Sequence, residues 1–134
     1  MTLLLLVATS CSQKPAEIHY GSDECAHCKM MITDERFAAQ IVTETGKAIK
    51  FDAIECMVNF ADNNKEETDK AKFWVSNFNE PGTWLDLKNA VLINSKEINS
   101  PMRANLLAVD SEEAAREHLR EYPGKRVSWE QLEN

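Results

Sequence analysis

The chain has 134 residues, close to the size of one ordinary domain. It carries 15 Lys and Arg residues against 22 Asp and Glu residues, a formal net charge of −7, which argues against a nucleic-acid partner because phosphate binding needs a basic surface. Hydrophobic residues make up 43%, too many for a disordered chain, and four glycines and four prolines exclude collagen-like or low-complexity architecture. The composition therefore indicates a small acidic globular domain.

The N-terminus has the features of a secretion signal. An apolar run over residues 3–8 leads through small residues to Cys11 and is far shorter than the roughly 20 residues that span a bilayer. This pattern is typical of a bacterial lipoprotein signal, in which cleavage precedes a cysteine that takes a lipid. We expect residues 1–10 to be the signal peptide, Cys11 to be lipidated and residues 11–22 to form a tether, which places the protein on the periplasmic face of the cell envelope. The alternative is a buried N-terminal strand with an ordinary cysteine.

The first half of the remaining chain is predicted to contain strands and one helix. Apolar stretches predict three strands, at residues 37–43, 47–51 and 73–78. Apolar positions recur with helical period over residues 54–61. Asp52 with Glu55 three residues later predicts a capping box at the start of this helix.

The second half repeats this order. Three more strands are expected at residues 90–94, 106–109 and 126–129. Ser111 is a candidate N-cap for a helix over residues 112–121, with His118 on its charged, solvated face. The predicted fold class is α+β, with two strand–strand–helix–strand (ββαβ) modules in one small domain, at about residues 23–82 and 83–134.

Soft sulfur side chains gather in three places: residues 25–31, the pair Cys56 and Met57, and Met102. Cys25 and Cys28 are spaced C-x-x-C, whereas Cys28 and Met30 are spaced C-x-M. Thiolates and thioethers together suit Cu(I) better than other common metals. Zinc rarely takes thioether sulfur, and iron–sulfur clusters usually need four thiolates, whereas three cysteines remain once Cys11 carries a lipid.

Ordinary structural roles compete with metal binding at several of these residues. Met31 and Met57 are expected in the core, whereas Met30 is favoured as a ligand because it lies two residues from Cys28. His27 is expected to face solvent, although it is a possible third donor. Cys56 fits a core or a ligand role equally well.

These blocks together resemble the NosL family, copper-binding lipoproteins that serve as accessory factors for nitrous oxide reductase. The resemblance rests on residues 25–32 (CAHCKMMI), 37–43, 50–57 (KFDAIECM), 100–102 (SPM) and the Trp129–Glu130 ending, in family order over roughly residues 19–134. It implies a non-enzymatic Cu(I) chaperone of two ββαβ modules. It also implies partners: nitrous oxide reductase, which receives copper for its copper–sulfide centre, and a membrane ABC-type maturation complex.

The resemblance also implies the ligands. Cys28 and Met30 match the family's C-x-M pair, and Met102 matches the methionine of the second module's loop, so these three are the primary predicted Cu(I) ligands. The secondary candidates are Cys25, His27, Cys56 and Met57. Many family members have glycine before the motif's methionine, where this chain has Lys29.

Two other classes of protein remain open. A periplasmic thiol–disulfide protein would use Cys25 and Cys28 as a redox pair. A zinc lipoprotein would need four ligands, for example His27 with the three cysteines. The placement of the methionines favours copper, because only a copper site uses them.

Overall fold

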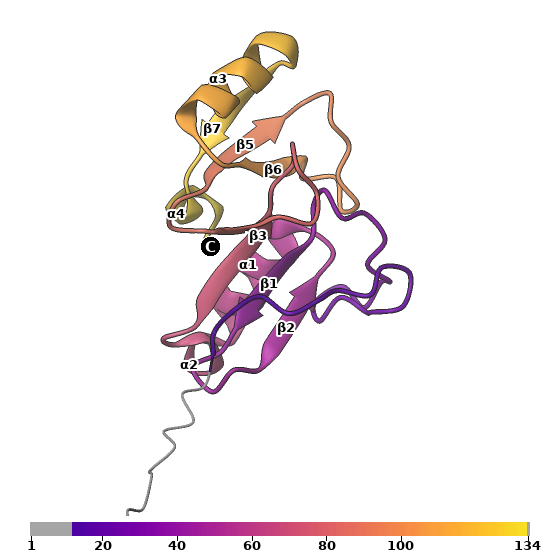
Figure 1. Ribbon diagram of the computed structural model, residues 1–134, viewed down its shortest axis with the longest axis vertical. Coiled ribbons are helices and arrows are strands. Elements are labelled where there is room, and N and C mark those ends of the chain that lie inside the picture. The colour runs from indigo at the N-terminus through magenta and orange to yellow at the C-terminus, as the bar shows by residue number, and fades with distance from the viewer. Residues whose placement is uncertain (1–11, 134) are drawn as a thin grey trace, which may run out of the picture.

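The computed structural model describes residues 12–133 and arranges them as two antiparallel sheets with helices packed against them (Figure 1). The expected signal peptide and lipid-bearing Cys11 lie outside the described residues. The elements in chain order are β1 (Ala39–Val42), β2 (Ala48–Phe51), α1 (Ile54–Asn63), α2 (Lys65–Thr68), β3 (Lys72–Ser76), β4 (Trp84–Asp86), β5 (Val91–Ser95), β6 (Leu106–Val109), α3 (Glu112–Glu121), β7 (Gly124–Val127) and α4 (Trp129–Leu132).

The two sheets share one topology. Their strand orders are β2-β1-β3-β4 and β6-β5-β7, so in each the module's first strand is central, flanked by its second strand and the strand after the helix. This confirms the predicted α+β class and the repeated ββαβ order. The extra strand β4 pairs with β3 and extends the first sheet to Asp86; at three residues it is too short to give a periodic pattern. The sheets meet where the Phe78 N–H donates to the Ala108 carbonyl oxygen, at 2.8 Å.

The central strand β1 is buried along its whole length because both faces of the first sheet are covered there. Helix α1 packs on one face, and the N-terminal segment crosses the other (Figure 1). The Gln40 side chain forms two hydrogen bonds with the backbone of Ala16, at 2.8 and 2.9 Å, and its cross-strand neighbour Trp74 donates to the Gln13 carbonyl oxygen at 3.0 Å. Much of the expected tether, residues 11–22, is thus packed against the sheet.

Helix α1 confirms the predicted apolar stripe but not the predicted cap. Its apolar positions are buried, as expected from their spacing. The N-cap is Ala53, which makes no side-chain bond, so the capping box of Asp52 and Glu55 is wrong. Asp52 is buried, and the Glu55 carboxylate accepts the Ala104 N–H of the other module at 3.3 Å. Neither carboxylate therefore serves as the side-chain cap of α1.

In the second module the predicted helix is confirmed over α3, and Ser111 caps it by accepting the Ala114 N–H at 3.1 Å. His118, expected to be solvated, is instead buried. It lies on the side of α3 that faces the sheet, where its Nε2 is 3.1 Å from Ser95 Oγ and its ring meets Phe78 edge-on. The prediction of a solvated His118 is therefore wrong: His118 is a core residue whose polar partner is Ser95.

Among the described residues, the buried hydrophobic core extends from Ile18 to Ala115. Within the described part of the chain, no helix is long and apolar enough to cross a membrane.

Candidate metal centre

Three thiols lie together at the N-terminal end of α1. The Sγ atoms of Cys25, Cys28 and Cys56 all lie within 4.8 Å of one another, and all three are free thiols. Cys25 and Cys28 come from the loop before β1, and Cys56 comes from the first turn of the helix. Cys25 and Cys56 are completely buried, whereas Cys28 is half-buried. The fold therefore adds Cys56, which the sequence left open as a core residue or a ligand, to the C-x-x-C pair.

The loop that carries the first two cysteines is a tight hairpin. The Cys25 N–H donates to the Met30 carbonyl oxygen at 2.8 Å, and the Lys29 N–H donates to the Cys25 carbonyl oxygen at 3.0 Å. Lys29 closes this turn with a φ of 65°, a left-handed conformation that favours glycine. This explains why a glycine before the motif's methionine suits the turn. The Lys29 side chain donates to the Ala26 carbonyl oxygen at 2.9 Å.

Backbone N–H groups act on the two sulfurs of this loop. Those of His27, Cys28 and Asp52 help to lower the pKa of Cys25, and that of Met30 opposes the rise in the pKa of Cys28. Such N–H groups favour a thiolate over a neutral thiol, because the amide dipole is attracted to the negative sulfur. The turn thus prepares both sulfurs to bind a cation.

The thiols differ in their affinity for protons. A hydrogen bond from the Cys56 thiol lowers the pKa of Cys25 well below its usual range, and the same bond, together with burial, raises the pKa of Cys56. Burial raises the pKa of Cys28. Burial also raises the pKa of two neighbouring carboxyl groups, Asp52 and Glu55. Of the three thiols, Cys25 is therefore the one with a lowered pKa.

The candidate thioether ligands lie at the surface. Met30, two residues after Cys28, is 53% exposed, and Met102 is 39% exposed. Met31 is also 53% exposed, so its expected place in the core is wrong: it lies on the outer arm of the hairpin, paired with Glu24. Met57 is fully buried, as expected for a core residue, and His27 is exposed, as expected between two inward-facing cysteines.

The loop that carries Met102 is tied to the helix that carries Cys56. Within this loop the Arg103 N–H donates to the Ser100 carbonyl oxygen at 3.0 Å, which forms a tight turn around Met102. The Ala104 N–H then donates to the Glu55 carboxylate at 3.3 Å. Figure 1 shows the loop between β5 and β6 on the same side of the molecule as the loop before β1. The fold therefore brings the loop of the second module to the thiol-bearing helix of the first.

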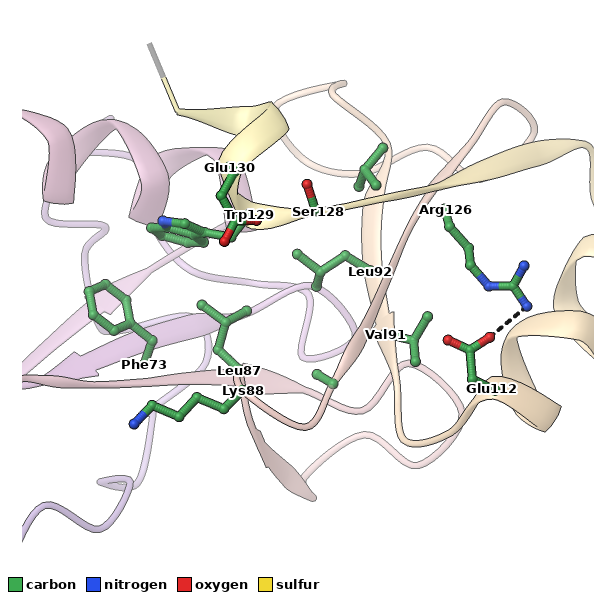
Figure 2. A pocket seen from close by; sticks show the side chains of 12 residues that line it. Phe73, Leu87, Lys88, Val91, Leu92, Glu112, Arg126, Ser128, Trp129 and Glu130 are labelled. Atoms are coloured by element: carbon green, nitrogen blue, oxygen red, sulfur yellow. Dashed lines mark ion pairs between the residues drawn. The ribbon is translucent and has the colours of Figure 1, made fainter.

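A separate groove of about 540 Å³ lies at the junction of the two modules (Figure 2). Phe73, Leu87, Leu92 and Trp129 line it, and an ion pair of 2.7 Å between Arg126 and Glu112 lies at one end. None of its twelve lining residues is a cysteine, methionine or histidine. The groove therefore plays no part in binding a soft metal ion.

The fold and the site define a small α+β domain with a thiol cluster suited to a soft metal ion. The chain belongs to the NosL family, whose model matches residues 15–134. Its fold is similar to that in the crystal structure of the copper chaperone NosL from Shewanella denitrificans, with a TM-score of 0.74 and 17% identity over 90% of this chain and 97% of that chain. A comparison with curated proteins found no match.

Proposed function

We propose that this protein is a Cu(I) chaperone, which binds and delivers copper without catalytic turnover. The observation that carries the proposal is the cluster of three free thiols, two of them in the tight turn that leads to the exposed Met30. Membership of the NosL family and the fold shared with a copper chaperone support it.

The thiol spacing fits a three-coordinate ion. Metal–thiolate bonds of about 2.3 Å place three donors in a plane about 4.0 Å apart, so sulfurs that lie within 4.8 Å need to move little. Cu(I) is a soft ion that suits such sulfur donors. A structural zinc site needs a fourth ligand, yet in the described residues no histidine or carboxylate joins the three thiols, and His27 is exposed. The donor set therefore favours copper over zinc.

The geometry disfavours a thiol–disulfide enzyme. Exchange begins with attack by an accessible thiolate. Here the sulfur with the lowered pKa, on Cys25, is fully buried, while the more accessible Cys28 has a raised pKa. The cysteine with the lowered pKa is therefore not the accessible one, whereas the attacking cysteine of a redox pair needs both properties.

Delivery of copper to a partner requires ligands that the partner can reach. Cys28 is half-buried and Met30 and Met102 are exposed, so a partner's ligands can approach these three, which we propose as the ligands during transfer. We further propose that lipid on Cys11 anchors the protein at the periplasmic face of the membrane. Its partners in this proposal are nitrous oxide reductase and its ABC-type maturation complex.

An anaerobic Cu(I) titration of residues 12–134 against a competing chelator tests the proposal, with Zn(II) run in parallel. We expect one tightly bound Cu(I) that zinc does not displace. Loss of neighbouring groups around a metal typically costs roughly 10- to 100-fold in affinity, so Cys28→Ser, which removes a ligand, should cost about 100-fold or more. His27→Gln, an exposed change between the two cysteines, is the matched control. Weak copper binding that is indifferent to Cys28→Ser would refute the proposal.

A further inference from the structure

Building on the proposed function, we propose that this chain has two copper positions that share Cys28. The inner position is formed by Cys25, Cys28 and Cys56, and the outer position by Cys28, Met30 and Met102. Because one sulfur belongs to both positions, a single bound Cu(I) can move between a buried and an exposed location without leaving that sulfur.

The inner position is built for a metal and not merely for packing. Buried cysteines often serve as small hydrophobic residues, but such a role does not require their convergence. Here three thiols from two segments, the loop before β1 and the first turn of α1, lie within 4.8 Å of one another.

The two positions differ in access. Cys25 and Cys56 are 0% and 1% exposed, so ligands from a partner cannot reach an ion held only by them. Met30 and Met102 are exposed, and the half-buried Cys28 lies between the two environments. An ion can therefore leave the inner position only by keeping its bond to Cys28 while other donors replace the two buried sulfurs.

Ligand exchange supplies a balanced route between the positions. An arriving Cu(I) binds Cys28 and the two thioethers; the sulfurs of Cys25 and Cys56 then displace the thioethers while the Cys28 bond persists. A cysteine that is protonated before it binds releases its proton to solvent and regains it when the ion departs, and copper stays Cu(I) throughout. Delivery is the reverse, with the partner's ligands displacing Cys28 last.

Selenium labelling separates the two positions directly. Residues 12–134 are prepared with selenomethionine at every methionine and loaded with one equivalent of Cu(I), and X-ray absorption at the selenium edge then reports copper–selenium contacts. We expect almost none in the wild-type chain, because the ion is at the inner position. In the variants Cys25→Ala and Cys56→Ala these contacts should appear, and affinity for Cu(I) should fall about 100-fold.

Methionine variants keep the test informative if the buried cysteine variants do not fold. Met30→Leu and Met102→Leu lie at the surface and should slow transfer of Cu(I) to a chelator about tenfold while weakening equilibrium binding far less than loss of a thiol does. Met31→Leu is the matched control, because Met31 is as exposed as Met30 and belongs to neither position.

Two results would overturn the inference: strong copper–selenium contacts in the wild-type chain at one equivalent, or transfer rates unaffected by both methionine changes. Both results can be told apart from failure of the proposed function. If the proposed function is wrong, the wild-type chain does not bind Cu(I) tightly. If only the two-position inference is wrong, the wild-type chain still binds Cu(I) tightly through Cys28.

Discussion

The two hydrogen bonds between Gln40 and Ala16, which we call the clamp, hold the N-terminal segment against the first sheet. Gln40 is completely buried in β1, and its side-chain amide both accepts from and donates to the backbone of Ala16. Replacement by leucine keeps a side chain of similar size but removes both bonds. It leaves the N–H and C=O of Ala16 without these partners.

The cost follows from the number of bonds lost. Each hydrogen bond contributes about 1 kcal/mol net, so Gln40→Leu should lower the free energy of unfolding by about 2 kcal/mol. With an unfolding entropy of about 2.1 cal/mol/K per residue, a loss of this size in a domain of roughly 120 residues lowers Tm by about 8 °C. The same change should expose the Ala16 amide to hydrogen exchange.

Urea denaturation and amide hydrogen exchange measure both effects. A chain that begins at Ile18 provides the control, because it lacks Ala16 and Gln40→Leu should then cost much less. A loss below about 0.5 kcal/mol with unchanged protection of Ala16 would show that the clamp does not hold the segment.

Three further predictions concern other parts of the fold. Burial lowers the pKa of His118, so the folded state favours its neutral form: the resulting stability is present above the unfolded-state pKa and is lost as pH falls through the folded-state pKa. Urea titrations at descending pH should show a smaller loss for His118→Gln than for wild type, and equal slopes would contradict this. Lys29 has a left-handed backbone conformation, so Lys29→Val should lower the free energy of unfolding by roughly 1–2 kcal/mol, whereas Lys29→Gly should change it by less than about 1 kcal/mol. Urea denaturation measures both changes, and equal effects of the two substitutions would show that the positive φ of Lys29 does not determine the cost. Ser111→Ala should cost about 1 kcal/mol through loss of the α3 cap, unless thermal melts of the two chains superimpose.

Local sequence determined the elements whose signals are local. The helix over 112–121 has a serine cap and strong helix formers, and the strand over 106–109 is an uninterrupted apolar run, so both were predicted with their observed bounds. The hairpin of β1 and β2 and the apolar stripe of α1 follow from the same short-range rules. Spacing also identified Cys28 and Met30 as neighbouring soft donors.

Tertiary structure decided which distant groups meet. Cys56 follows Cys28 by 28 residues. Periodicity within a helix does not tell whether a cysteine in its first turn is a core residue or a metal ligand. The packing of α1 beside the loop that carries Cys25 and Cys28 places Cys56 with the other two thiols. In the same way His118 is buried because Ser95 on another strand supplies its partner, and Asp52 is buried without capping α1. Short-range patterns encode the conformation of a segment, whereas the environment of a polar or sulfur side chain depends on contacts between segments that only the folded chain brings together.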